Sequence, residues 1–168
     1  GAELKNTICL NKGSNAFMSQ HLGDMQHIEA TGFHDEIVEH FQNTLAVSPS
    51  LVVHDKHPNY YTTRKAKELG YPSLALQHHA AHAFALLGEN PVNEPCLVLA
   101  LDGTGYGDDG TLWGGEALWV HSQTGEYERL GAFSPLPLPG GEAAIAEPWR
   151  MAHALCLQNA IDPGPFPW

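Results

Sequence analysis

Cysteine is scarce in this sequence. The three cysteines, Cys9, Cys96 and Cys156, are far apart, odd in number and set in apolar surroundings, and no Cys-x-x-Cys pair occurs. A disulfide framework and a zinc ribbon both need paired cysteines, so the spacing argues against both. We therefore expect structural cysteines and a protein of the reducing cytoplasm.

Positive charge and long apolar runs are also scarce. Lys and Arg total 8 against 19 Asp and Glu, which gives a formal net charge of -11, and the longest basic cluster is Arg64-Lys65-Ala66-Lys67. Binding to a phosphate backbone needs a basic surface, so we predict no nucleic-acid partner. No apolar stretch approaches the roughly 18 residues of a membrane span, and we predict no membrane segment. The 168 residues, 43% of them hydrophobic, suit one globular domain.

Histidine, by contrast, is abundant, with 11 residues. If a helix begins within Gln77-His78-His79-Ala80-Ala81-His82, His78 and His82 lie at i and i+4 on one face. Asp102 ends the apolar run 96–101, which predicts a buried strand, and α/β proteins place their chemistry at the carboxyl ends of such strands. These residues form a candidate two-histidine, one-carboxylate metal site with open positions. The alternatives are an ordinary helix face and, after Asp102, a pair of simple turns.

Apolar periodicity and turn residues predict the order of the elements. Two strands, 4–10 and 16–22, flank a hairpin connection at 11–15. Further strands are expected at 51–53, 73–76, 96–101, 111–120 and 127–133, and helices at 34–45, 62–69, 80–87 and from 147 onward. Because strands and helices alternate in the middle of the chain, we predict a mostly parallel α/β sheet.

Other polar groups fall where ligands bind in such folds. Asp55 and His57 follow the strand at 51–53 and are candidate acid–base or substrate-binding groups, although a solvated loop is the simpler interpretation. Lys5, Asn6 and Thr7 combine a cation, an amide and a hydroxyl that would suit a phosphate, and an ordinary exposed edge is the alternative.

Glycines mark three further segments. Those in 103–107 would let backbone N–H groups approach an anion. The pair Gly114-Gly115 inside an expected strand predicts a bulge or a close approach to the backbone. Gly140-Gly141 ends a stiff, proline-rich loop, and the helix that follows has apolar residues on more than one face. Since this helix and the tail 163–168 lack a surface to pack on, we expect a fragment or a truncated relative.

Seven blocks of the sequence, taken in order, resemble the HypF family of carbamoyltransferases, which act in the maturation of nickel–iron hydrogenases. The blocks are Glu3-Leu4-Lys5-Asn6-Thr7, His54-Asp55-x-His57-Pro58, Gln77-His78-His79-x-Ala81-His82, Asp102-Gly103-Thr104-Gly105-Tyr106-Gly107, Trp113-Gly114-Gly115-Glu116, Pro137-Leu138-Pro139-Gly140-Gly141 and Glu147-Pro148-Trp149-Arg150. They cover almost the whole chain.

The resemblance lies in the C-terminal, TsaD-like part of HypF and implies a fold. That fold is an actin-like, sugar-kinase (ribonuclease H-like) α/β lobe with a mixed sheet, an N-terminal hairpin and flanking helices. Residues 1–168 would form a single domain, the first lobe, without a second lobe and without the acylphosphatase-like, zinc-finger and YrdC-like regions.

The resemblance also implies roles for individual residues. His78, His82 and Asp102 would be ligands of zinc or iron. The residues that would face phosphate or adenylate are Lys5, Asn6, Thr7, Gly103, Thr104, Gly105, Gly140 and Gly141. No catalytic residue is assigned, and Asp55 and His57 remain candidates without a role.

The implied reaction starts from carbamoyl phosphate and ATP, with magnesium. A YrdC-like domain makes carbamoyl adenylate from them, and the TsaD-like domain passes the carbamoyl group to the C-terminal cysteine of HypE, where it becomes the cyanide ligand of the hydrogenase iron. Two other hypotheses stay open: a metal-dependent phosphoanhydride hydrolase with His57 or Glu116 as base, and a non-catalytic lobe that docks on HypE or self-associates.

Overall fold

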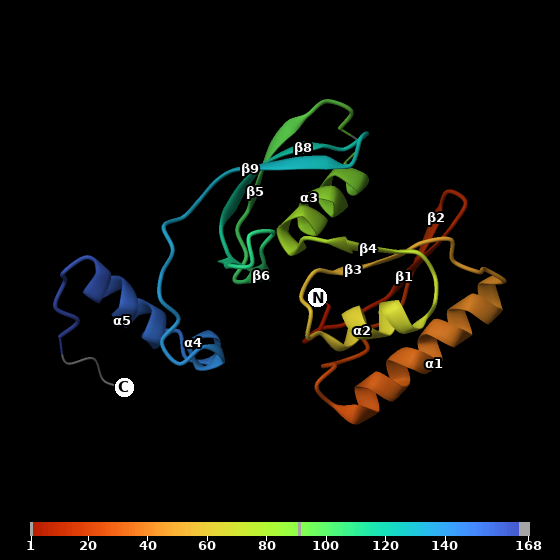
Figure 1. Ribbon diagram of the computed structural model, residues 1–168, viewed down its shortest axis with the longest axis horizontal. Coiled ribbons are helices and arrows are strands. Elements are labelled where there is room, and N and C mark those ends of the chain that lie inside the picture. Colours follow the sequence, from red (N-terminus) through yellow and green to blue (C-terminus); the bar gives the residue numbers. More distant parts are fainter. Residues whose placement is uncertain (1, 91, 165–168) are drawn as a thin grey trace. The chain divides into compact units, whose positions relative to one another are not determined.

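The computed structural model describes residues 2–90 and 92–164, and Figure 1 shows the chain. The polypeptide divides into two compact units, residues 1–132 and residues 133–168. The predicted tail at 163–168 lies largely outside the described residues, since only 163 and 164 belong to them. In the described part, no helix combines the length and apolar character needed to cross a membrane.

The first unit opens with the predicted hairpin. Strands β1 (Cys9–Lys12) and β2 (Asn15–Met18) pair antiparallel, with Cys9 opposite Met18. Gly13 has a φ of 61°, which suits a tight two-residue turn. Glycine adopts this positive φ without the strain that most other residues would have there. The turn is therefore shorter than the connection expected at 11–15, and the strands are shorter than 4–10 and 16–22.

Helix α1 (Ile28–Leu45) includes the predicted helix at 34–45 and begins six residues earlier. Its N-cap, His27, makes no side-chain cap hydrogen bond, so no sequence signal marks this start. The helix ends at Ala46, which adopts a left-handed conformation and donates its backbone N–H to the carbonyl of Asn43.

Strands β3 (Val52–Asp55) and β4 (Ser73–Leu76) pair in parallel, and α2 (Tyr61–Glu68) connects them. In this register Asp55 lies opposite Leu76. The carboxyl ends of parallel strands meet at one edge, so Asp55 comes close to the residues that follow β4. These residues begin α3 (His78–Glu89).

Helix α3 packs on a three-stranded antiparallel sheet, as Figure 1 shows. The sheet has the order β5 (Cys96–Ala100), β8 (Glu116–His121) and β9 (Glu126–Ala132). The core consists of apolar residues of the helix packed against apolar residues of the strands and of the segment before β8: Ala80, Ala83, Leu87, Val98, Trp113, Leu118 and Val120. Each large apolar side chain buried here contributes about 1.5–3 kcal/mol.

The side chains of β5 alternate between exposed and buried. Leu97 and Leu99 are 55% and 61% exposed, whereas Val98 and Ala100 are buried. Side chains alternate between the faces of a strand, so β5 buries only every second residue. The strand predicted at 96–101 is therefore present, and its predicted burial holds for one face alone.

In the sequence, two short strands lie between β5 and β8. They are β6 (Gly105–Tyr106) and β7 (Leu112–Trp113), which pair with each other in an antiparallel arrangement. The strand expected at 111–120 is thus interrupted at Gly114-Gly115. A Cβ atom on Gly114 would lie 2.2 Å from the carbonyl oxygen of Gly103, which accounts for the glycine by a close backbone approach.

The mixed α/β class is confirmed, but the prediction of a mostly parallel sheet is wrong. In the described part, the named strands form four small sheets, and the β3–β4 pair alone is parallel. No helix lies between β5 and β9, and parallel pairing usually relies on a helical crossover connection.

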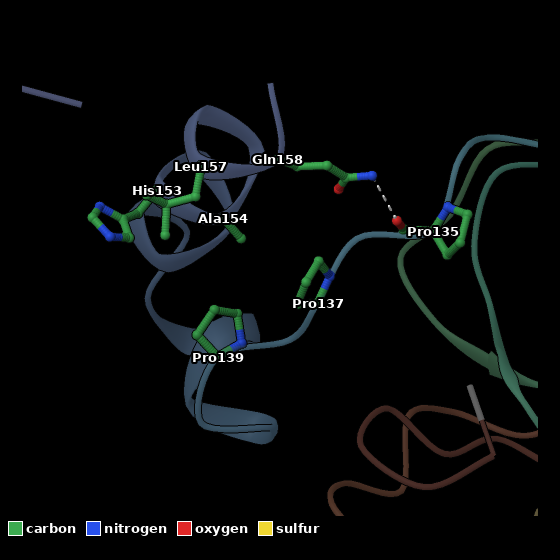
Figure 2. Close-up of a pocket in the computed structure, with 7 residues that line it drawn as sticks. All are labelled: Pro135, Pro137, Pro139, His153, Ala154, Leu157 and Gln158. Atoms are coloured by element: carbon green, nitrogen blue, oxygen red, sulfur yellow. Dashed lines mark hydrogen bonds between the residues drawn. The ribbon is translucent and has the colours of Figure 1, made fainter. Parts of the chain in front are cut away.

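The second unit contains α4 (Glu142–Ala146), which was not predicted, and α5 (Trp149–Gln158), which corresponds to the helix expected from 147. Figure 2 shows Pro137 and Pro139 on the side of the loop that faces α5, and Gln158 reaching towards Pro135. The loop and the helix line a hollow of about 570 Å³. The side-chain amide of Gln158 donates to the carbonyl of Pro135 at 3.4 Å, which ties the two segments together.

Candidate metal centre

Three elements of the first unit bring a polar cluster together. Helix α3 starts directly after β4 and places His78 in its first turn and His82 one turn later. Asp102 follows the carboxyl end of β5 and supplies a carboxylate from a separate element. The predicted helix start at the histidines and the predicted position of Asp102 are therefore both observed.

We name His78, His82 and Asp102 the ligand cluster. Oδ2 of Asp102 lies 3.0 Å from Nε2 of His78 and 3.4 Å from Nε2 of His82, and the two Nε2 atoms are 3.2 Å apart. One donor atom from each residue lies within 4.8 Å of the other two. This convergence of two imidazoles and one carboxylate matches the donor set of zinc or iron sites.

The protons of the cluster give a further test of whether a cation fits. Nδ1 of His78 lies 3.3 Å from Oδ2 of Asp55, and a carboxylate only accepts, so Nδ1 carries the proton. Nε2 of His78 then presents a lone pair towards Oδ2 of Asp102. Two lone-pair atoms 3.0 Å apart repel each other unless a proton or a metal ion lies between them, so this contact suits either a second proton on His78 or a bound metal ion.

The charges around the cluster favour positive charge at His78. Burial alone would raise the pKa of Asp55, but hydrogen bonds from the His78 side chain and the His57 backbone outweigh it and lower that pKa. The hydrogen bond to Asp55 and the negative charge of Asp102 raise the pKa of His78 against the effect of burial. The two shifts are consistent, because each partner stabilises the charged form of the other.

The cluster is open on one side. The side chain of His82 is 59% exposed, whereas those of His78 and Asp102 are 24% and 30% exposed. A hollow of about 230 Å³ adjoins it, lined by His82 and Asp102 at the polar end and otherwise by apolar residues of α3 and β5. A ligand could therefore approach an ion held here without displacing protein groups.

The two candidate catalytic residues, Asp55 and His57, lie next to the ligand cluster through the contact between Asp55 and His78. Oδ1 of Asp55 accepts the backbone N–H of His57 at 2.7 Å, and its other oxygen faces His78. The ring of His57 stacks on Tyr60 with ring centres 4.1 Å apart. The structure thus connects Asp55 to a candidate ligand, a contact that was not expected from the sequence. Their catalytic role stays a prediction.

The proposed phosphate-facing residues near the N-terminus differ from one another in burial. Asn6 is buried, and its amide donates to the carbonyl of Ala2 at 2.9 Å, while its backbone bridges to Gly23. Lys5 and Thr7 are exposed. The structure therefore presents two of these three side chains to solvent and uses the third within the chain.

The glycine segments also differ from one another. Gly103 and Thr104 are exposed next to Asp102, but Gly105 is buried, and a Cβ there would lie 2.7 Å from Cβ of His78. Gly105 thus allows β6 to approach the start of α3. Gly140 and Gly141 belong to the second unit, are exposed, and have positive φ values of 85° and 61°.

The structure also shows the surroundings of the three cysteines and of Glu116, the other candidate base. Cys9 is exposed, Cys96 and Cys156 are half-buried, and all three are free thiols. Cys9 is therefore not a core residue, contrary to the expectation that all three cysteines are structural. Glu116 is buried and accepts from Nε of Arg129 at 2.6 Å and from the backbone of Gly114 at 2.9 Å, which commits this candidate base to structural contacts.

Gln77 and His79 are the polar residues that sequence reasoning did not single out. Both are fully buried, and the amide nitrogen of Gln77 lies 3.0 Å from Nδ1 of His79. Burial lowers the pKa of His79 and outweighs the negative charge of Asp102, which acts to raise it. Their place inside the histidine block, next to two candidate ligands, was the available signal.

Two family models match the chain. The HypF Kae1-like domain matches residues 1–89, and the second subdomain of the carbamoyltransferase Kae1-like domain matches residues 98–165. The ligand cluster takes His78 and His82 from the first matched segment and Asp102 from the second.

Curated relatives agree with these models. The chain is 49% identical to carbamoyltransferase HypF2 of Cupriavidus necator over 99% of its own length, and 43% identical to carbamoyltransferase HypF of Rhizobium leguminosarum bv. viciae over 100%. It spans 21% and 22% of these two relatives, about a fifth of their length.

Solved structures confirm the fold class. A crystal structure of full-length HypF in the phosphate- and nucleotide-bound form matches 95% of the chain with a TM-score of 0.88 and 38% identity. The crystal structure of T. kodakarensis HypF matches 94% with a TM-score of 0.84 and 35% identity. The chain covers 21% of each of these structures. The matched domain models, the relatives and these structures agree, and the chain belongs to the HypF carbamoyltransferase family.

Proposed function

We propose that this chain provides the metal-holding part of a carbamoyltransferase that acts in hydrogenase maturation. The observation that carries the proposal is the ligand cluster, in which two imidazole nitrogens and a carboxylate oxygen converge beside an open hollow in a HypF family member. Zinc and iron both suit this donor set.

The reaction we propose is the transfer of a carbamoyl group from carbamoyl adenylate to a thiol. The thiolate of the C-terminal cysteine of HypE attacks the carbamoyl carbon, a C–S bond forms, and the bond from that carbon to the adenylate phosphate oxygen breaks. AMP leaves with the bonding electron pair. Carbamoyl adenylate itself would come from ATP, with magnesium, and carbamoyl phosphate in a YrdC-like domain of the longer protein. A cytoplasmic location suits the free thiols and remains part of the proposal.

The residues of the chain have distinct tasks in this proposal. A divalent metal, when bound, supplies Lewis-acid polarisation of oxygens on the mixed anhydride and offsets charge on the leaving group. His78 and His82 bind it as neutral imidazoles, and Asp102 contributes negative charge. Asp55 holds the proton on Nδ1 of His78, which directs the Nε2 lone pair towards Asp102.

The backbone beside Asp102 would position the phosphate of the adenylate. Gly103 and Thr104 are exposed directly after the ligand, where short loops can direct N–H groups towards an anion. Lys5, Asn6, Thr7, Gly140 and Gly141 remain proposed phosphate- or adenylate-facing residues, on the strength of the family resemblance.

The assignment of residues 1–168 to one lobe also remains a proposal. The candidate ligands come from both matched family segments, 1–89 and 98–165. A division of the chain between His82 and Asp102 would therefore separate the ligands, and the metal site needs both segments.

Metal content is the direct test. The chain is purified with and without added zinc or iron, and elemental analysis compares it with His78→Ala and with His40→Ala, which removes an exposed histidine on α1. We expect stoichiometric metal in the unmodified chain and in His40→Ala, and loss in His78→Ala. Equal metal in all three would contradict the site.

The transfer step is tested in the full-length protein. Carbamoylation of the HypE C-terminal cysteine is followed by mass spectrometry, with ATP and carbamoyl phosphate supplied. We expect His78→Ala to lose transfer to HypE while the YrdC-like domain still forms carbamoyl adenylate. Full transfer by that variant would show that the cluster does not serve this reaction.

A further inference from the structure

The carboxylate of Asp102 uses its two oxygens differently. Oδ2 faces the Nε2 atoms of His78 and His82, whereas Oδ1 lies 2.6 Å from Nε2 of His79. His79 is fully buried and is not part of the ligand cluster. A carboxylate divided in this way has one oxygen available for a metal and one turned towards the protein interior.

Gln77 determines which nitrogen of His79 carries the proton. It caps α3, because its Oε1 accepts the backbone N–H of Ala80 at 2.9 Å. This contact turns the amide nitrogen towards Nδ1 of His79, at 3.0 Å, and towards the carbonyl of Tyr106, at 3.4 Å. An amide nitrogen only donates, so Nδ1 accepts and the proton of the neutral ring is on Nε2.

The ring of His79 is also held in place by packing. A Cβ atom on Gly105 would lie 2.8 Å from Cε1 of His79, so β6 presses directly on the ring. In residues 2–90 and 92–164, neither Nε2 of His79 nor Oδ1 of Asp102 has a well-aligned hydrogen-bond partner, although the two atoms are 2.6 Å apart. The two atoms therefore face each other at a distance short enough for a hydrogen bond.

We propose that Gln77 and His79 are positioning residues that orient Asp102 for metal binding. The helix cap fixes the amide of Gln77, the amide places the proton of His79 on Nε2, and this proton directs Oδ1 of Asp102 inward so that Oδ2 faces His78 and His82. The proposal rests on the proposed metal site. Outer partners of this kind typically change metal affinity by about 10–100-fold.

Two substitutions separate this role from simple packing. The amide nitrogen of a glutamine reaches about as far as Nε2 of histidine, and that of an asparagine reaches only about as far as Nδ1. His79→Gln therefore keeps a donor for Asp102, and His79→Asn removes it at similar polarity. Zinc affinity is measured for both variants and the unmodified 168-residue chain by competition with a coloured chelator, and circular dichroism and thermal unfolding report the fold.

We expect His79→Gln to bind zinc within about threefold of the unmodified chain and His79→Asn to bind about 10–100-fold more weakly. Equal affinities in two folded variants would overturn the positioning role and leave the metal site intact. Absence of zinc binding by the unmodified chain would overturn the metal site and, with it, this proposal.

A measurement on the unmodified chain covers the case in which a variant fails to fold. Two-dimensional ¹⁵N–¹H spectra of histidine-labelled chain identify the tautomer of each ring. We expect His79 to show a protonated Nε2 and an unprotonated Nδ1 before and after zinc is added, while the signals of His78 and His82 move. A protonated Nδ1, or a zinc-bound nitrogen on His79, would contradict the proposal.

Discussion

Two clusters of histidine and aspartate in the first unit look alike and differ in how completely the protein satisfies them. In the α1–α2 cluster, made of His34, Asp35, Tyr61 and Lys65, the carboxylate of Asp35 accepts from the Tyr61 hydroxyl at 2.8 Å and from Lys65 at 2.5 Å, and its Oδ1 lies 3.2 Å from Nδ1 of His34. Both of its oxygens have partners.

The carboxylate of the ligand cluster, Asp102, is less completely satisfied. Asp102 faces three imidazole rings, and its buried Oδ1 has no well-aligned hydrogen bond in the described part of the chain. Among the described residues, Asp102 forms ion-pair contacts with histidines and with no lysine or arginine, whereas Asp35 pairs with Lys65. The comparison teaches that proximity of histidine and aspartate is not enough to mark a metal site. The proposed site differs from the α1–α2 cluster in its open hollow and in a carboxylate whose buried oxygen has no aligned hydrogen bond.

The largest expected effect is a loss of zinc affinity when one residue of the ligand cluster is removed. His82→Ala should weaken zinc binding by more than about 100-fold, since it removes a ligand and outer partners alone account for 10–100-fold. Because His82 is exposed, the fold should be unchanged. Isothermal titration with zinc measures the affinity, and circular dichroism measures the fold.

The matched control is His34→Ala in the α1–α2 cluster. His34 is buried and packs edge-on against Tyr61, so its removal should lower the free energy of unfolding by about 1–3 kcal/mol and leave zinc affinity unchanged. Unfolding of His82→Ala, or loss of zinc binding by folded His34→Ala, would reverse the assignment of the two clusters.

A second prediction concerns the glycine that packs against the ligand cluster. Gly105→Ala places a Cβ 2.7 Å from Cβ of His78, and the overlap should displace the start of α3, cost about 1–3 kcal/mol of stability and weaken zinc binding. Gly103→Ala is the control, because its Cβ would meet no atom within 4 Å. Urea unfolding and zinc titration of both variants measure the difference. Identical behaviour of the two variants would contradict the close packing.

A third prediction sharpens the structural role of the α1–α2 cluster. Asp35→Ala removes the acceptor shared by Tyr61 and Lys65, which join α2 to α1. Loss of these hydrogen bonds should lower the free energy of unfolding by about 1–2 kcal/mol at neutral pH, with unchanged zinc affinity. Urea unfolding measures the first quantity and zinc titration the second.

The smallest expected effect is the pH dependence of the contribution that Asp35 makes to the free energy of unfolding. Burial acts to raise the pKa of Asp35, but hydrogen bonds from Lys65, Tyr61 and His34 outweigh it and hold this pKa below its ordinary value of 3.8. The unfolded chain therefore takes up the proton first as the pH falls, and the stabilisation is complete above that value. We expect the stability difference between the unmodified chain and Asp35→Asn to shrink as the pH falls below about 4, through the lower pKa of the folded state. A difference that grows on acidification would show the opposite shift.

Local patterns predicted most elements of the first unit. The hairpin turn at Gly13, the strand at 73–76 and the helix at the histidine block all follow from turn chemistry and periodicity within a few residues. The direction of pairing did not follow, because whether β5 runs parallel or antiparallel to a neighbour depends on which later strand it meets.

In the candidate site, too, the local features were predicted from the sequence and the non-local contacts were not. The spacing of His78 and His82 and the position of Asp102 after a strand are local features, so the ligand cluster was predicted. The contact between Asp55 and His78 depends on the register of β3 against β4, in which Asp55 lies opposite Leu76. The orientation of Gln77 depends on a helix cap, and glutamine is not among the residues that usually signal one.

The closeness of the candidate ligands along the chain has a kinetic consequence. His78, His82 and Asp102 are separated by one helix and one strand, so an ion that joins them closes a short loop, whose entropic cost is small. Contacts of low sequence separation form early in folding. We therefore expect the segment from β4 to β5 to be the first part of the chain that zinc can organise, and zinc added during refolding should accelerate the appearance of α3.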